Sequence, residues 1–329
     1  MKIRNLAMIL GVALLLCCAC HNKSNEVETA EAPATSMEFR TLGSTGLQVG
    51  VIGIGCGAFG KMDTAQSREF MALALDSGVN YIDIYDANPT VRGNIGYALH
   101  GKRDQMIIQG HIGSYWNGEQ YERTRDVEKA KQGFNDLLSL LGTDHIEVGM
   151  IHIADTHEEW EEIINSPFLD YVKQLKEEGK IQHIGISSHN AEVALEAAKS
   201  GLVEVIMFSL NPAFDLLPSG VNPWDDDSFE NIPASIDPVR VELYDYCAQH
   251  NIAITAMKAF GSGGGRLLDA EKSPLKIALT PTQCLSYALS KPCIATVVCG
   301  ASNIDELKAD LYYNHATEEE KDFRSVLGK

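Results

Sequence analysis

The sequence predicts an α/β fold, a single-domain (β/α)8 TIM barrel, from three observations. First, short apolar runs alternate with amphipathic stretches at helical spacing from residue 47 onward. Second, there are eight such runs, and both faces of each are apolar, as in a parallel sheet that is covered on both sides. Third, the first run is not followed by the GxGxxG motif of an open dinucleotide-binding sheet. A closed barrel therefore fits better than an open, doubly wound sheet.

The expected elements follow in order along the chain. Residues 38–50, with a turn at Ser44–Gly46, predict a β-hairpin that precedes the barrel. The predicted barrel strands are residues 49–55, 79–85, 105–110, 145–152, 181–187, 203–209, 252–258 and 294–300. Clear helical spacing is found in residues 65–78, 125–142, 190–201 and 238–251. Each of these four stretches ends in Gly or Asn, the usual stop signal of a helix.

The first 37 residues predict export and anchoring. Lys2 and Arg4 precede an unbroken apolar run, which is typical of a secretory signal. Cys20 follows Ala19 in a context that resembles a bacterial lipobox, although the position three before it is a cysteine. We expect a lipoprotein signal peptide at residues 1–19, lipidation of Cys20, a flexible tether at 20–37 and the barrel at 38–329. The expected location is extracytoplasmic, as a membrane-anchored lipoprotein of the cell envelope or periplasm.

Charge and cysteine usage exclude several classes of protein. The formal net charge of −18 argues against nucleic acid as a partner, because a phosphate backbone needs a basic surface. The cysteines beyond Cys20 are odd in number, lack a CxxC pair and mostly stand in apolar stretches. They indicate small buried side chains, neither a disulfide framework nor a zinc site.

Polar residues at the ends of the predicted strands are the candidate site. In barrels of this type the chemistry lies at the carboxyl ends of the strands. The residues found there are Cys56, Asp83, Tyr85, His111, His152, Ser187 to Asn190, Ser209 to Asn211, Lys258 and Gly300 to Asn303. Two imidazoles, a carboxylate, a phenol and an ammonium at one mouth form a set that is able to move protons.

Three loops at the same end are candidate binding segments. Residues 209–237 form a long loop, which predicts a lid or binding loop. Residues 111–126 supply Tyr115, Trp116 and Tyr121 beside His111, and such aromatics suit sugar rings and flat carbonyl compounds equally. The glycine-rich stretch 261–265 could let backbone amides approach a phosphate, and a plain linker is an equally good interpretation.

Several sequence blocks together resemble one family. They are FRTLGSTGLQVGVIGIG (39–55), GVNYID (78–83), IGYALHGKRDQMII (95–108), TDHIEVGMIH (143–152), LKEEGKIQHIGISSHN (175–190) and CGASNIDELKAD (299–310). In this order they are similar to the aldo-keto reductase superfamily over about residues 38–327. The resemblance implies a barrel that binds a nicotinamide dinucleotide and reduces carbonyls with an Asp, Tyr, Lys and His set.

The resemblance assigns two of the four catalytic positions and leaves two altered. Asp83 matches the family aspartate and His152 the family histidine. Asn88 stands at the tyrosine position, and His111 stands at the lysine position. Because an imidazole titrates near neutral pH, it can donate a proton itself. We predict that His111 together with Tyr85 replaces the missing pair.

The resemblance also implies a set of cofactor contacts. They comprise Gly55, Cys56, Ser187, Ser188, Lys258, Gly261, Ser262, Gly263, Gly300, Ser302 and Asn303. The Met257–Lys258 pair is similar to a branch whose C-terminal iron–sulfur cysteine block this chain lacks. Glu306 replaces the arginine that contacts the 2′-phosphate of NADP, and Asp310 replaces an asparagine, so we expect NAD to be preferred over NADP.

Three functional hypotheses follow from these residues. The first is an aldo-keto-reductase-like oxidoreductase that transfers hydride between a nicotinamide cofactor and a carbonyl, alcohol or sugar-like substrate. The second is an exported lipoprotein that uses the barrel to bind a sugar or metabolite without redox turnover. The third is a metal site built from Asp83, His111 and His152, whose ligand types suit zinc. The expected partners are a small molecule and, through the lipid anchor, a membrane.

Overall fold

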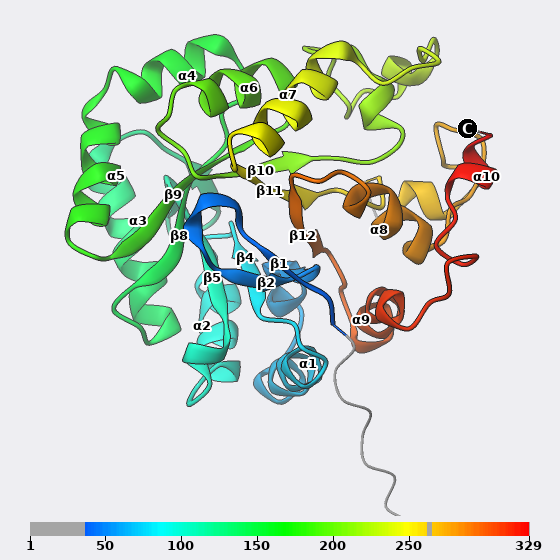
Figure 1. Ribbon diagram of the computed structural model, residues 1–329. Coiled ribbons are helices and arrows are strands. Elements are labelled where there is room, and N and C mark those ends of the chain that lie inside the picture. Colours follow the sequence, from blue (N-terminus) through cyan, green and yellow to red (C-terminus); the bar gives the residue numbers. More distant parts are fainter. Residues whose placement is uncertain (1–36, 262–264, 329) are drawn as a thin grey trace, which may run out of the picture. The chain divides into compact units, whose positions relative to one another are not determined.

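The structure is a computed structural model that describes residues 37–261 and 265–328. The predicted signal peptide and Cys20 lie outside the described residues, as do Ser262 and Gly263. Eight parallel strands close into a barrel in the order β10-β11-β12-β3-β4-β5-β8-β9, with helices around it (Figure 1). The predicted fold class is confirmed.

Each barrel strand lies within, or overlaps, one of the eight predicted apolar runs. The strands are β3 (Ile52–Gly55), β4 (Tyr81–Ile84), β5 (Ile107–Ile112), β8 (Ile146–Ile151), β9 (Ile181–Ser188), β10 (Val205–Ser209), β11 (Ala253–Met257) and β12 (Ile294–Cys299). Nearly all of their residues are buried. This explains why no polar alternation marks them in the sequence, since side chains face either the barrel interior or the helices.

Helices connect successive barrel strands, and two further helices follow the last strand. The helices are α1 (Thr64–Asp76), α2 (Pro89–Ala98), α3 (Val127–Leu141), α4 (His157–Ile164), α5 (Pro167–Glu177), α6 (Ala191–Lys199), α7 (Pro238–Gln249), α8 (Pro281–Leu289), α9 (Ile304–Leu311) and the short α10 (Arg324–Leu327). Asp63 caps α1 by accepting a hydrogen bond from the backbone N–H of Gln66. Gly142 ends α3 with φ 65°, a left-handed conformation that favours glycine. Among the described residues, no helix is long and apolar enough to cross a membrane.

Two apolar layers hold the barrel together. One lies between the strands and the surrounding helices and includes Phe70, Phe134 and Trp160. The other includes Val148 and Met150 of β8, two positions apart on one face of the strand, and this face points to the barrel interior, whereas the adjacent Ile151 belongs to the first layer. The interior is thus a packed core, and space for a ligand is expected only at the ends of the barrel.

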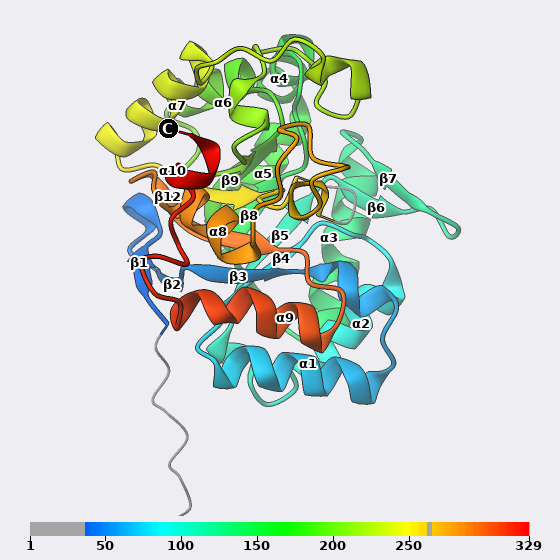
Figure 2. The same cartoon turned by 90° about the vertical axis from the view of Figure 1, so that its right-hand side faces the viewer.

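Two β-hairpins flank the barrel at opposite ends (Figure 2). The first, β1 (Phe39–Thr41) with β2 (Gln48–Gly50), confirms the predicted hairpin and adds Leu42 and Val49 to the interior core. The second, β6 (Ser114–Trp116) with β7 (Tyr121–Arg123), lies within residues 111–126, which the sequence suggests to be a loop. Antiparallel pairing of Trp116 with Tyr121 makes this segment an ordered structure beside the carboxyl ends of the strands.

Candidate active site at the carboxyl end of the barrel

A cavity of about 630 Å³ lies at the carboxyl ends of the strands. This volume is within the range of small-molecule and cofactor sites, about 300–1,000 Å³. Its wall includes eleven of the predicted site residues: Gly55, Asp83, Tyr85, His111, His152, Ser187, His189, Lys258, Gly300, Ala301 and Ser302. The barrel therefore brings together most of the side chains that the strand-end rule selects.

Three of these residues form a hydrogen-bonded row. His111 Nε2 lies 2.9 Å from Asp83 Oδ1, and His111 Nδ1 lies 2.6 Å from His152 Nδ1. All three side chains are at most 2% exposed. A carboxylate and two imidazoles in direct contact can pass a proton along the row.

Strand register explains why these residues meet. β4 and β5 pair with Asp83 opposite Gln109, so His111 lies two positions further along β5 on the same face of the strand. β5 and β8 pair with Ile112 opposite Ile151, and His152 follows at the end of β8. Each imidazole is thus fixed by a buried strand, which suits a group that must hold a constant geometry.

The side chain of Gln109 also contacts Asp83, and the sequence analysis does not identify Gln109 as a site residue. Its Nε2 donates to Asp83 Oδ1 at 2.6 Å, while its Oε1 accepts from the Tyr81 hydroxyl at 2.6 Å and from Thr255 Oγ1 at 3.1 Å. All of these groups are buried. The period of two along β5, which puts Gln109 and His111 on one face, is a signal that could have identified it.

The row is extended by Tyr121 of β7, whose hydroxyl is hydrogen-bonded to His152 Nε2. The sequence predicts Tyr85 for such a role, but in the structure the Tyr85 ring is 42% exposed and packs edge-on against Tyr121 at 6.5 Å. The Tyr85 hydroxyl makes no hydrogen bond with the described residues. Tyr85 and His111 both line the cavity, and their joint replacement of the missing catalytic pair stays a prediction.

Burial and charge decide the protonation of the row. The pKa of His152 is lowered well below its usual range, first because the ring is buried and then because His111 lies beside it. His152 is therefore neutral at neutral pH. Because His111 Nε2 faces a carboxylate it carries a proton, and when His111 is neutral its Nδ1 accepts from His152 Nδ1–H. His152 Nε2 is then an acceptor for the Tyr121 hydroxyl.

The predicted cofactor residues divide into two groups. Gly55, Ser187, Lys258, Gly300 and Ser302 line the cavity, with Ser187 Oγ accepting from the backbone N–H of Ile153 at 2.8 Å. Partial burial lowers the pKa of the Lys258 ammonium. The other group does not form part of the cavity wall. It consists of Cys56, Ser188, Gly261 and Asn303 among the described residues.

The residues away from the wall have structural partners. Cys56 is fully buried, and burial raises the pKa of its thiol to about 12, so it is an inert apolar group. Ser188 Oγ contacts Asp155 and the backbone of Asn190. Asn303 caps α9 by accepting from the backbone N–H of Glu306 at 2.9 Å.

Glu306 and Asp310 lie on α9 and line the same cavity, but their environments differ. Glu306 accepts from the backbone N–H and the hydroxyl of Ser302 and from Asn303 Nδ2, at 2.7–2.9 Å, and the Ser302 hydrogen bonds lower its pKa. Asp310 is 3% exposed, and its Oδ2 has no hydrogen-bond partner among the described residues. Burial raises the pKa of Asp310 to about 7.

The long loop 209–237 reaches residues of the cavity wall. The Lys258 ammonium lies 5.3 Å from the centre of the Trp224 ring, and the His189 ring packs edge-on against Trp224 at 5.4 Å. Both Lys258 and His189 line the cavity. The position of Trp224 agrees with the interpretation of this loop as a lid or binding loop.

Metal ligation was a third hypothesis for Asp83, His111 and His152. Within the part of the chain that the structure describes, only His157, Glu161 and Glu196 bring three possible ligand atoms within 4.8 Å of one another. These residues lie on α4 and α6 at the surface, and clusters of exposed acidic groups are common without a metal. In the buried row, the facing Nδ1 atoms of the two imidazoles are instead bonded to each other.

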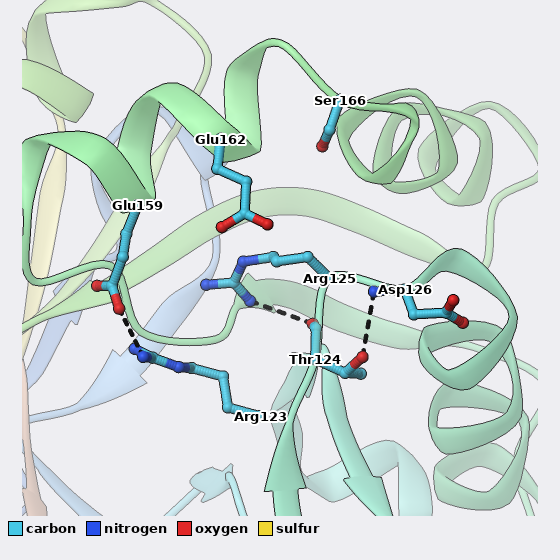
Figure 3. A pocket seen from close by; sticks show the side chains of 7 residues that line it. All are labelled: Arg123, Thr124, Arg125, Asp126, Glu159, Glu162 and Ser166. Atoms are coloured by element: carbon cyan, nitrogen blue, oxygen red, sulfur yellow. Dashed lines mark hydrogen bonds and ion pairs between the residues drawn. The ribbon is translucent and has the colours of Figure 1, made fainter.

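A second, smaller cavity of about 430 Å³ lies between the end of β7 with the residues that follow it and α4 (Figure 3). Its wall is formed by Arg123, Thr124, Arg125, Asp126, Glu159, Glu162 and Ser166. The Arg123 guanidinium pairs with Glu159, and that of Arg125 donates to the backbone oxygens of His152 and Ile153 at 2.8 and 2.6 Å. Arg125 therefore links the wall of this cavity to the backbone of His152.

Comparison with known proteins gives one consistent result. Residues 51–277 match the model of the Aldo/keto reductase family. The chain is 29% identical over 299 residues to the uncharacterized oxidoreductase YqkF of Bacillus subtilis, an alignment that covers 86% of this chain and 94% of the relative. It is 25% identical over 205 residues to L-galactose dehydrogenase of Arabidopsis thaliana, which covers 56% of this chain and 61% of that enzyme.

Solved structures agree on the fold. An aldo-keto reductase of Bacillus halodurans in its holo form superposes with a TM-score of 0.68 at 24% identity, covering 89% of this chain and 97% of that one. A further crystal structure, a putative aldo-keto reductase from Pseudomonas aeruginosa, gives a TM-score of 0.65 at 22% identity over 85% of this chain and 96% of that one. Both are similar to this chain in the barrel itself.

Proposed function

The chain belongs to the aldo/keto reductase family, and from that premise we propose that it is a NAD(P)-dependent oxidoreductase. The reaction is hydride transfer between the nicotinamide and the carbon of a small carbonyl or alcohol, with a sugar-like compound as the favoured substrate. The observation that supports this most is the row of Asp83, His111 and His152, which opens into the cavity at the carboxyl end of the barrel.

The cavity fits a dinucleotide in two respects. Gly57 and Gly300 line it, and a Cβ at either position would meet no atom within 4 Å, so the backbone there is open to a close ligand. The unpartnered Oδ2 of Asp310 offers a polar group at the α9 side of the wall. We expect Gly55, Ser187 and Lys258 to complete the contacts, and a bound dihydronicotinamide would supply the hydride.

NAD is the preferred cofactor in this proposal. The Glu306 carboxylate is held at the cavity wall by Ser302 and Asn303, and hydrogen bonding keeps it ionised. Asp310 adds a second acidic group on the same helix. A 2′-phosphate placed near the ionised Glu306 carboxylate would be repelled, whereas a ribose hydroxyl can donate to either carboxyl group.

The side chains at the mouth support a sugar-like substrate. Tyr85 and Trp224 are both large exposed aromatics, 42% and 43% exposed, at or beside the cavity. Met207 and Met257 give the wall an apolar part. Aromatic faces next to polar groups suit the apolar face and the hydroxyls of a sugar ring.

The proposal is tested by oxidation of NADH and NADPH in the presence of a panel of aldoses, ketoses and simple aldehydes. We expect NADH oxidation with at least one compound and formation of the matching alcohol in equal amount. If no compound is turned over but a sugar raises the melting temperature, the barrel acts as a binding module and the oxidoreductase proposal is rejected.

We also propose that the protein is a lipoprotein anchored outside the cytoplasm, on the evidence of the N-terminal sequence alone. Expression of the full chain and of Cys20→Ser in a bacterium, followed by fractionation and mass spectrometry, tests this. Membrane association and an acylated N-terminal peptide are expected for the unaltered chain only. Equal distribution of both proteins in the cytoplasm would contradict the proposal.

A further inference from the structure

At the end of the hydrogen-bonded row, one imidazole nitrogen makes no contact with another member of the row. His111 uses Nε2 for Asp83 and Nδ1 for His152, and His152 uses Nδ1 for His111. Only His152 Nε2 remains, and the hydroxyl of Tyr121 occupies it. Any proton that leaves or enters the row at this end therefore passes through the Tyr121 oxygen.

We propose that Tyr121 of the β6–β7 hairpin is the residue that exchanges a proton with the substrate oxygen, and that His152 and His111 recharge it. This inference rests on the proposed oxidoreductase function. It assigns the acid–base role to a tyrosine of the hairpin. The role then belongs neither to position 88, which is an asparagine in this chain, nor to Tyr85. Tyr121 is close to the reaction site because its partners His152 and Tyr85 both line the cavity.

The proton balance closes in the direction of carbonyl reduction. The step starts from the state in which His111 is protonated: its Nε2–H faces the Asp83 carboxylate, its Nδ1–H donates to His152 Nδ1, and His152 carries its own proton on Nε2. Tyr121 gives its O–H proton to the substrate oxygen and takes the Nε2–H proton of His152, which in turn takes the Nδ1–H proton of His111. His111 ends neutral, and one proton from water restores the imidazolium.

In the direction of alcohol oxidation the same steps run backwards. The Tyr121 oxygen accepts the alcohol proton while it donates its own proton to His152 Nε2, and His111 ends as the imidazolium beside Asp83. The row thus stores the proton next to a buried carboxylate, where a positive charge is stabilised. An isolated phenol has no such neighbour that holds a proton. Burial raises the pKa of Tyr121 to about 12, so Tyr121 is a poor acid unless a charged neighbour assists it.

The hairpin is built to hold Tyr121 in place. Tyr121 pairs with Trp116, and Ser114 at the start of the hairpin donates to the backbone oxygen of Tyr85 at 2.5 Å. At the end of β7, Arg123 pairs with Glu159 (Figure 3). Just beyond β7, Arg125 donates to the backbone oxygens of His152 and Ile153. Arg125 is a positioning residue, because it links the chain that carries Tyr121 to the backbone of its imidazole partner.

Kinetics give the first test, with NADH and a substrate found as described above. Tyr121→Phe is expected to lower kcat/KM by about 10²–10⁴-fold, the usual contribution of a general acid, while the Kd for NADH stays within about twofold. Tyr115→Phe, on the same hairpin and outside the cavity wall, is the matched control and should lose less than about threefold. A loss below tenfold for Tyr121→Phe overturns the proposal, and any larger loss that the control does not share supports it.

Nuclear magnetic resonance of ¹⁵N-labelled histidines gives a second test that needs neither cofactor nor substrate. In the unaltered chain, when His111 is neutral, His152 is expected in the Nδ1–H form with Nε2 as a hydrogen-bond acceptor. Tyr121→Phe should shift the Nε2 resonance, and Tyr85→Phe should leave it unchanged. Unchanged histidine spectra in Tyr121→Phe would overturn the proposal.

The two tests separate this inference from the function on which it rests. If the unaltered chain binds neither NADH nor NADPH, the oxidoreductase function fails and the acid–base role of Tyr121 fails with it, even where the histidine spectra show the contact. If NADH is bound and oxidised equally well by Tyr121→Phe, only the role of Tyr121 fails.

Discussion

Two buried carboxylates of this barrel, Asp83 and Asp215, have opposite surroundings. Asp215 is fully buried near the start of the loop after β10. Its carboxylate accepts hydrogen bonds from the hydroxyls of Tyr244 and Tyr287, both at 2.6 Å. It also forms ion pairs with Arg240 at 3.3 Å and Lys291 at 3.4 Å. Asp83, which is 1% exposed, contacts an imidazole and an amide, and among the described residues it pairs with no lysine or arginine.

The difference separates a structural carboxylate from a functional one. The charge of Asp215 is balanced by two permanent cations, it is not part of the cavity wall, and it fixes the loop. The charge of Asp83 is balanced only when His111 is protonated, and both residues line the cavity. A buried carboxylate with a titratable partner can change state during a reaction, whereas one with fixed partners cannot.

The largest expected effect is on turnover, from Asp83→Asn. The amide cannot stabilise the imidazolium of His111, so we expect kcat to fall by about 10²–10⁴-fold with little change in the free energy of unfolding. Steady-state kinetics and urea unfolding measure the two quantities. If the variant keeps more than a tenth of the activity, the row does not store the proton.

The same substitution at the other carboxylate, Asp215→Asn, is the matched comparison. It leaves Arg240 and Lys291 buried without a counter-charge, so we expect a loss of about 3–5 kcal/mol in the free energy of unfolding. Protein that remains folded should keep normal NADH oxidation. A loss below about 1 kcal/mol, measured by urea unfolding, would show that the contrast between the two sites is wrong.

Asp310 represents a third situation, a buried carboxyl with neither kind of partner. Because burial raises its pKa to about 7, the folded state binds the proton more tightly than the unfolded state, and stability is lost as the pH rises toward that value. In Asp310→Asn this loss should disappear. Between about pH 5 and pH 8 the variant should gain roughly 2–3 kcal/mol relative to the unaltered chain. Parallel pH curves for the two proteins would contradict the raised pKa.

The smallest effect is expected at Glu306, a carboxylate held by neutral donors. Glu306→Gln keeps an acceptor for Ser302 and removes the charge, so NADPH should bind about tenfold more tightly while NADH changes less than about twofold. Fluorescence titration of both cofactors measures this. Equal gains for NADH and NADPH would show that Glu306 does not act on a 2′-phosphate.

The fold could be predicted because its signals are local. Eight apolar runs separated by helical stretches become the barrel strands β3, β4, β5 and β8 to β12, and the hairpin at residues 38–50 follows from its own turn. The structure of segment 111–126 is harder to predict, since three-residue strands such as β6 and β7 are too short to show an alternation of apolar and polar residues. Its order comes from pairing, which the local pattern does not show.

The site could be predicted only in part, for the same reason. Asp83, His111 and His152 stand at the ends of buried strands, where barrel geometry selects them from position alone. Tyr121 lies ten residues beyond His111, and only the return of β7 along β6 brings its hydroxyl back to His152. Tyr85 is closer to Asp83 in sequence, and its exposed ring shows that sequence distance is a poor guide to side-chain direction in loops.

The most direct test of the account is titration of residues 21–329 with NADH and NADPH, followed by the fluorescence of the nucleotide. The account predicts saturable binding of NADH at the cavity, with weaker binding of NADPH. If neither nucleotide binds, the account is contradicted, because the residues from Asp83 to Tyr121 would then have no bound source of hydride.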